Sequence, residues 1–349
     1  MRQTLRHKKP EADGQGASPL AQEPHALPYP PPSLATRDSD DTLAVATPPA
    51  MLNEKRTSTT PGPPPIPFAW PRGKHAVRLY LFLLLAFVEV EVIPLALFYG
   101  LRYGTDTANW ITFAIITALW GFNIYWQLTR RSWYLFRREE YRPIGVTSKW
   151  ALDFTAWTGT LSTCAAVVLL TIGTIPTDVW VRVCAMAVPA IMFVLGLIGW
   201  AVLHYALFGW PAPFRLSSTA KGEIVKPCAY YFVEDVLAVD GKGGRAVREA
   251  MAARYNASPR FRRMLFVQSI FFVFPMLILA AGLTVVAVLH AISRPIVFGV
   301  CSGVPWIWVV MWALISWAMV KRDLRREREE WSKNQASLLG QCSCCPRSA

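Results

Sequence analysis

The chain has 349 residues, is 53% hydrophobic and carries a formal net charge of +13. Its mean hydropathy of +0.28 reflects six apolar stretches, each long enough to cross a hydrocarbon core of about 30 Å as a helix. An ordinary soluble domain is thereby excluded. The basic residues flank these stretches, so they indicate membrane topology and contact with anionic lipid head groups, and no nucleic-acid partner is expected.

Residues 1–72 form a polar segment with two proline-rich runs, Pro28–Pro32 and Pro61–Pro67. Few large apolar side chains occur here, so little surface can be buried to offset the entropy lost on ordering. We predict a disordered cytosolic tail with local polyproline II character. A ligand for SH3 or WW domains is the alternative.

The rest of the chain alternates apolar spans with polar connections. Spans one to four lie within residues 73–207, a polar loop follows over 208–263, and spans five and six lie within 264–320. Residues 321–349 form a basic, cysteine-containing tail, of which residues 321–333 should continue span six as a charged helix. The fold predicted is all-α, a polytopic membrane helix bundle, because backbone groups in lipid must be satisfied within each segment. The six expected transmembrane helices cover 76–99, 110–128, 150–175, 180–207, 264–290 and 295–320.

Lysine and arginine are distributed unevenly between the connections. They concentrate before span one, between spans two and three, in the long loop and after span six. The other three connections hold only Arg102, Arg182 and Arg294. The positive-inside rule therefore predicts that both termini and the long loop are cytosolic.

Two carboxylates stand near the middle of span one, at Glu89 and Glu91. A carboxylate in the bilayer core costs several kcal/mol unless it is paired, protonated or hydrated. At this spacing the two side chains should point about 200° apart on a helix, which argues against a paired acid–base dyad. Asn123 and Asp153 are further candidates for a transport pathway. In the alternatives, partners such as Asn123, Arg102 or Arg182 neutralise the carboxylates, or Glu91 lies near the outer head groups.

The loop over 208–263 has the pattern of a helical hairpin. Apolar residues recur at helical spacing on both sides of a turn at Gly241. Ser258 and Pro259 suit the N-cap and first position of the helix that enters span five. We therefore predict a folded hairpin on the cytosolic face. Residues 226–241 and 257–265 resemble a segment of uncharacterised multi-pass membrane proteins of filamentous fungi, which implies a multi-pass topology and a fungal origin and carries no activity with it.

The turn of this hairpin is rich in glycine. Its backbone amides, with two basic side chains, are candidates for binding a lipid phosphate or another anion; a plain glycine-rich turn is the alternative. The acidic residues Glu234, Asp235 and Asp240 lack the spacing of an EF-hand. The anion-site candidates are Gly241, Lys242, Gly243, Gly244 and Arg245.

The remaining motifs are weaker. Cys342, Cys344 and Cys345 are candidates for lipidation or are free thiols. Gly299 and Gly303 form a GxxxG pair that allows close helix approach within the chain or, less favoured, in a homodimer. No nucleophile–base pair and no metal-ligand spacing stands out, so we expect no metal and no cofactor, and an enzyme is the third and weakest functional option.

Two functions fit these features. The first is transport of a proton, a cation or a small solute, using Glu89 or Glu91. The second is a non-catalytic membrane scaffold whose basic cytosolic face binds lipid head groups or protein partners. A polar path through the spans is the feature that separates them.

Overall fold

The computed structural model describes residues 62–67, 73–148, 150, 152–176 and 178–342. Most of the tail predicted over residues 1–72 therefore lies outside the described residues. Within these ranges the protein is helical, with two isolated β-bridges and no strand. The elements in order are α1 (Lys74–Phe87), η2 (Val88–Val92), α2 (Ile93–Gly104), α3 (Asn109–Arg137), η3 (Glu139–Tyr141), α4 (Phe154–Thr174), α5 (Val181–Ala185), α6 (Ala187–Phe208), α7 (Cys228–Asp235), η4 (Val236–Asp240), α8 (Gly244–Ala257), α9 (Pro259–Val288) and α10 (Arg294–Cys342).

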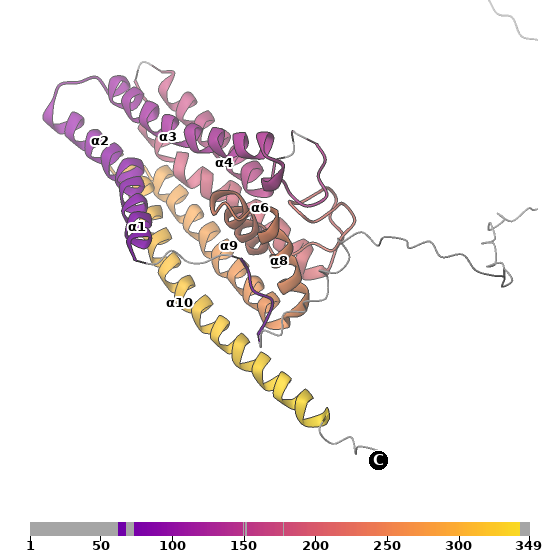
Figure 1. Cartoon of the computed structure of the whole chain (residues 1–349). Coiled ribbons are helices and arrows are strands. Elements are labelled where there is room, and N and C mark those ends of the chain that lie inside the picture. The colour runs from indigo at the N-terminus through magenta and orange to yellow at the C-terminus, as the bar shows by residue number, and fades with distance from the viewer. Residues whose placement is uncertain (1–61, 68–72, 149, 151, 177, 343–349) are drawn as a thin grey trace, which may run out of the picture. The chain divides into compact units, whose positions relative to one another are not determined.

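Six helical stretches are long and apolar enough to cross a membrane, as the sequence predicts. The first is the continuous run α1–η2–α2, and the fourth combines α5 and α6. The remaining four are α3, α4, α9 and the first part of α10. Figure 1 shows these helices running alongside one another, with α1 and α2 at one edge of the bundle.

Several boundaries differ from the predicted ones, for local reasons. α3 continues to Arg137 and so includes the segment expected to leave the membrane after residue 128. Asp153 precedes α4 as its N-cap, where its carboxylate accepts the amide of Ala156 at 2.8 Å. The break in span four falls at Met186. That is one turn before Pro189, because a proline ring clashes with the carbonyl four residues earlier.

Two prolines inside spans each free a backbone carbonyl, and a tryptophan from a neighbouring helix satisfies each one. Pro94 has no N–H to donate to Val90, whose carbonyl accepts the Trp120 indole at 2.7 Å instead. Pro275 leaves the carbonyl of Phe271 free in the same way, and the Trp312 indole donates to it at 2.8 Å. Neighbouring helices thus supply the hydrogen bonds that lipid cannot.

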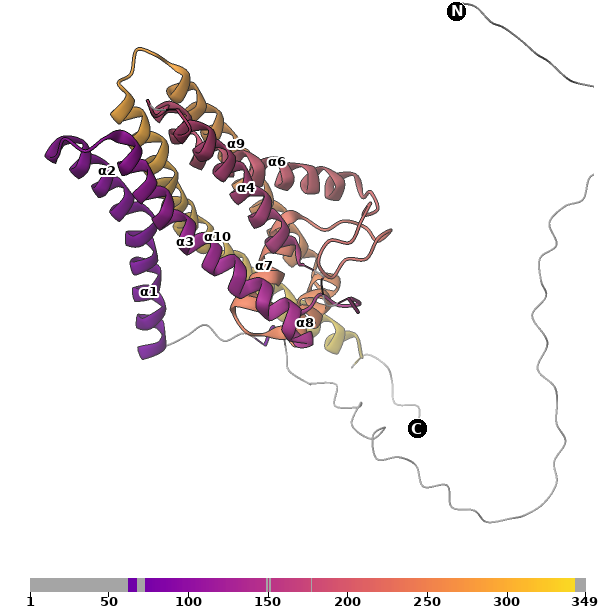
Figure 2. The same cartoon turned by 90° about the horizontal axis from the view of Figure 1, so that it is seen from above.

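The long loop folds against one end of the bundle, which we call the loop end. α7 and α8 form the expected hairpin and contact α9, and α7 also contacts α4 (Figure 2). Gly241 ends the π-helical turn η4, and the Ser258 hydroxyl caps α9 by accepting the amide of Phe261 at 3.2 Å. Tyr230, Tyr231 and other buried side chains give this end its own apolar core.

α10 continues well past the span, as predicted for the start of the tail. Its charged part is held against the hairpin and α9 by ion pairs. Glu327 pairs with Arg254 of α8, and Glu330 pairs with Arg260 of α9 at 2.6 Å. α10 is therefore braced at the loop end.

Candidate functional site

Glu91 lies in the π-helical turn η2, where Pro94 disturbs the regular hydrogen-bond ladder. Its side chain is only 5% exposed, and neither carboxylate oxygen has a hydrogen-bond partner. Gly303 of α10 faces it, since a Cβ at that glycine would lie 3.6 Å from Glu91 Oε1. π-Helical turns inside α-helices occur frequently at functional sites. A buried, unpartnered carboxylate in a span is thus the main chemical irregularity of the membrane region.

The other groups considered with Glu91 are placed differently. Glu89 is exposed on the outer side of η2, so the two carboxylates point apart, as their spacing predicts. Arg102 donates to Asn109 at 3.2 Å. Arg182 donates to carbonyls around the end of α9, including Leu289 O at 2.7 Å. Neither arginine pairs with a span-one carboxylate, and the Asn123 side chain lies outside the described residues.

A cavity of about 450 Å³ lies among the membrane-spanning helices. We call it the central cavity. Residues from all six spans line it, including Val90, Trp120, Thr163, Met192, Met276 and Trp306.

The lining of the central cavity is mainly apolar. Its polar side chains include Gln127 and Thr163, whose hydroxyl donates to Gly159 O at 2.9 Å. The indole nitrogen of Trp306 is buried without a partner. Glu91 itself does not line the cavity, but it follows the lining residue Val90 and faces Gly303, which precedes the lining residue Trp306 by one turn. The cavity therefore suits an apolar occupant with few polar atoms better than a hydrated ion.

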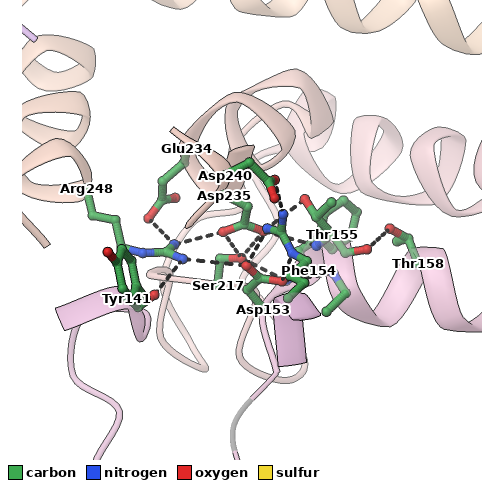
Figure 3. Close-up of polar contacts among 12 residues, drawn as sticks. Tyr141, Asp153, Phe154, Thr155, Thr158, Ser217, Glu234, Asp235, Asp240 and Arg248 are labelled. Atoms are coloured by element: carbon green, nitrogen blue, oxygen red, sulfur yellow. Dashed lines mark hydrogen bonds and ion pairs between the residues drawn. The ribbon is translucent and has the colours of Figure 1, made fainter. Parts of the chain in front are cut away.

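The second polar site is a buried ion-pair network at the loop end, and Figure 3 shows it. Arg248 of α8 is fully buried and lies 2.8 Å from Asp235, 3.1 Å from Glu234 and 3.6 Å from Asp153. Arg131 of α3 holds Asp153 at 2.6 Å and also pairs with Asp240. The network consists of Arg131, Asp153, Glu234, Asp235, Asp240 and Arg248.

Asp235 is the most extensively partnered carboxylate of this network. Besides Arg248, it accepts the Thr155 amide at 3.0 Å and the Ser217 hydroxyl at 2.8 Å. Burial, together with the nearby charges of Asp153 and Glu234, raises the pKa of Asp235 to about 7, although Arg248 acts in the opposite direction. The network thus has one carboxyl that can change its charge near neutral pH.

This network gives Asp153 a different place from the one expected. As the cap of α4 and a partner of Arg131, it belongs to the loop end and lies away from the central cavity. Thr155 also joins the network, and the Ser162 hydroxyl donates to Thr158 O within α4 at 2.7 Å. The polar residues of span three therefore serve local hydrogen bonding.

The glycine-rich turn has few free amides for an anion. The amides of Gly241, Lys242 and Gly243 donate to backbone carbonyls of η4, at 2.8–3.3 Å. Gly244 adopts a positive φ, where a Cβ would approach Glu140 O to 3.1 Å. Arg245 pairs with Glu249 on the surface. Binding of an anion here stays a prediction that rests on exposed basic side chains.

The GxxxG glycines pack within the chain. A Cβ at Gly299 would lie 2.2 Å from the Tyr99 hydroxyl, and Gly303 faces Glu91. A homodimer through these glycines would need the face of α10 that already packs against Tyr99 and Glu91. Of the lipidation candidates, Cys342 ends α10 with an undescribed side chain, and Cys344 and Cys345 lie outside the described residues.

Sequence reasoning missed the two arginines that organise the network. Arg248 directly follows Val247 and lies three residues before Met251, so its place beside the apolar stripe of α8 is a local signal of a buried charge. Arg131 looked like part of an interfacial basic segment. Neither position indicates its acidic partners, some of which come from distant parts of the chain.

Comparison with known proteins gives a family and no activity. No curated protein matches the chain, and no solved structure matches it. A family model described as "Domain of unknown function (DUF8766)" matches residues 52–331. This match covers most of the chain, including all six spans and the loop hairpin, and the chain therefore belongs to this family.

Proposed function

We propose that this protein is a proton-coupled membrane transporter of a small, mainly apolar solute, and that Glu91 carries the proton. We also propose the orientation that the basic flanks predict, with both termini and the loop end in the cytosol. The observation that carries the proposal is the buried, unpartnered Glu91, whose neighbour Val90 lines a cavity to which every span contributes.

The chemistry of Glu91 supports a proton. An ionised carboxylate without a partner costs several kcal/mol in apolar surroundings. The site therefore favours a neutral Glu91, with a proton bound to one carboxylate oxygen. Release of that proton requires water or a basic solute to reach the carboxylate. The charge state of Glu91 is therefore coupled to the presence of water or solute next to it.

The lining of the central cavity supports the class of solute. A hydrated cation needs several oxygen ligands or a continuous water path, and the cavity offers mainly aliphatic and indole surface. An apolar solute with one or two polar atoms fits such a site, because the few polar groups can orient it.

Proteoliposomes that enclose a pH-sensitive dye test this proposal. Small apolar amines, alcohols and carboxylic acids are added in turn, and proton movement is followed with and without protein. We expect at least one solute class to drive protein-dependent proton movement, and Glu91→Gln to reduce it to background. Glu89→Gln is the matched control, because that carboxylate lies outside the bundle, and it should retain the flux.

A second measurement needs no solute. An apolar carbodiimide reacts with protonated carboxyls in apolar surroundings, so it should label Glu91, and mass spectrometry locates the adduct. The transporter proposal fails if the solute panel gives the same proton movement for the wild type and Glu91→Gln at equal protein incorporation. It also fails if Glu91 resists the carbodiimide over the whole accessible pH range.

A separate observation favours the scaffold as a second candidate function. At the loop end, a pocket of about 210 Å³ between α9 and α10 contains four arginines and one acidic residue. Such a cluster suits the phosphate of an anionic lipid head group. Its charged residues are Arg260, Arg263, Arg322, Arg326 and Asp323.

Thermal unfolding with added lipid tests this candidate. Phosphatidylserine should raise the unfolding temperature more than phosphatidylcholine does, and the double substitution Arg322→Gln with Arg326→Gln should remove the difference. Arg328→Gln with Lys333→Gln removes equal charge from the same helix outside the pocket and should keep it. Equal loss in both double variants would mean that the basic surface acts only through its overall charge.

A further inference from the structure

A second cavity, which we call the loop-end cavity, has a volume of about 480 Å³. It lies between α6, α7, α8, α9 and α10, and apolar side chains make up almost all of its surface. Leu195 and Met276 line both this cavity and the central one, so these two side chains stand between them.

The lining of the loop-end cavity extends along several turns of α9. Its lining residues on α9 extend from Phe261 to Met276, a length of about 22 Å at the helical rise. An elongated apolar ligand, such as an extended hydrocarbon chain, suits an apolar lining of this length.

One polar group in the cavity has no partner. Gln268 is 5% exposed and accepts the Ser316 hydroxyl on Oε1 at 2.7 Å, but its amide nitrogen donates to nothing. The neighbouring Ser269 hydroxyl is engaged, since it donates to Leu265 O and accepts the amide of Ala229. A buried N–H without an acceptor is costly. A ligand with a carbonyl or carboxylate oxygen would satisfy it.

A short proline-rich segment reaches this cavity from outside the helices. Within residues 62–67, Ile66 is partly buried against the loop-end core, whereas Pro65 and Pro67 on either side are exposed. Ile66 is also the one lining residue, among those described, that no helix contributes. It therefore occupies apolar volume that a chain-like ligand would otherwise fill.

We propose that the loop-end cavity binds one fatty acyl chain, with its carbonyl or carboxylate oxygen accepting the Gln268 amide, and that Ile66 is a tethered competitor for the same space. The carboxylic acid and its esters share this chemistry. The proposal does not depend on transport through the central cavity. Binding of the acyl chain requires the segment over 62–67 to move away, so the site is less available while Ile66 is seated.

Photolabelling of the purified full-length protein tests the proposal. The probes are palmitic acid and its methyl ester, each with a photoreactive diazirine on the chain, and unlabelled palmitate is the competitor. Saturable adducts should map to lining residues of α7 and α9. Ile66→Ala should raise apparent affinity by about threefold to tenfold, because it removes the competitor. Gln268→Leu should lower it by about tenfold.

Matched variants separate the site from general lipid contact. Val233→Trp fills the cavity from a partly exposed position of α7 and should abolish labelling, whereas Ile224→Ala changes an exposed loop residue outside the cavity and should not. Unfolding temperatures identify variants that fail to fold.

The proposed site is wrong if unlabelled palmitate fails to reduce the labelling, or if the labelling persists in Val233→Trp. Either result would indicate contact with surrounding lipid only. A diacyl lipid retained there in native mass spectrometry overturns the single-chain ligand. Unchanged labelling in Ile66→Ala overturns the role of the segment. Preference for the acid over the ester, or the reverse, identifies the form of the ligand.

Discussion

The loop end and the middle of the bundle contain the same kind of group, a buried carboxylate, in opposite circumstances. At the loop end, Asp235 has an arginine, a hydroxyl and a backbone amide as partners. In the middle of the bundle, Glu91 has none. Burial alone therefore does not distinguish a structural carboxylate from a functional candidate. The presence or absence of hydrogen-bond and ion-pair partners does distinguish them.

The two regions differ in what their buried carboxylates contribute to stability. A partnered network fixes the geometry of the elements that meet in it, here α3, α4, α7 and α8. It also makes any single deletion costly, because the remaining charges stay buried. An unpartnered carboxylate contributes nothing to stability and leaves its lone pairs open for a proton or a ligand. The two regions should therefore respond to substitution with opposite signs.

The largest expected effect is at Arg248. Replacing it by methionine leaves Asp235, Glu234 and Asp153 buried without their shared cation, and we expect the free energy of unfolding to fall by about 3–5 kcal/mol. Thermal unfolding in detergent measures this. Arg245→Met is the matched control on the same helix, since its pair with Glu249 is exposed, and it should change stability by less than about 0.5 kcal/mol.

Glu91→Leu should have the opposite sign. The substitution removes an unsatisfied buried carboxyl and supplies apolar surface, so we expect a gain of about 1–3 kcal/mol in unfolding free energy. The same thermal assay applies, with Glu89→Leu on the exposed side as comparison. A clear loss of stability in Glu91→Leu would show that Glu91 has a structural partner, and the contrast between the regions would disappear.

Trp120→Phe tests whether the turn that carries Glu91 depends on its neighbour. The substitution keeps an aromatic ring but removes the N–H that satisfies Val90 O. We expect a loss of about 1–2 kcal/mol, measured by thermal unfolding, together with altered carbodiimide labelling of Glu91. Trp126→Phe changes an exposed indole on the same helix and should leave both measurements unchanged.

The smallest effect concerns pH. The pKa of Asp235 is raised to about 7 in the folded protein, above about 3.9 for an unfolded aspartate. Between these values the folded state binds the extra proton, so stability falls as pH rises through this window. We expect unfolding at pH 8 to require about 1 kcal/mol less than at pH 6. Asp235→Asn mimics the protonated carboxyl and should reduce this dependence; a dependence that persists unchanged in Asp235→Asn would assign it to another group.

Much of the fold is readable from the sequence because its signals are local. The length of each apolar stretch predicts a span, and the pattern around Gly241, Ser258 and Pro259 predicts the hairpin and its capping. The boundaries differ where tertiary contacts decide them. α3 continues past the expected end because its last turns pack against the hairpin, and Asp153 leaves the first turn of α4 to become its cap.

The sites are less readable, since they depend on pairing across the chain. The spacing of Glu89 and Glu91 predicts that they diverge, but not which one turns inward. Pro94 lies three residues after Glu91, and its effect becomes clear only once Trp120 is seen to take up the freed carbonyl. Arg131 has an acidic partner 22 residues away, and Arg248 has acidic partners 14 or fewer residues away. Each arginine also has an acidic partner more than 90 residues away. No local sequence pattern encodes such a range of separations.

The length of α10 has a mechanical consequence. The helix runs 37 residues beyond Pro305 to Cys342, which is a lever arm of about 55 Å at the helical rise. A change of about 10° in the bend at Pro305 would move the tip by about 10 Å. Pro305 itself lines the central cavity. Such a change would displace the end of α10, and the ion pairs of Glu327 with α8 and of Glu330 with α9 would oppose the movement.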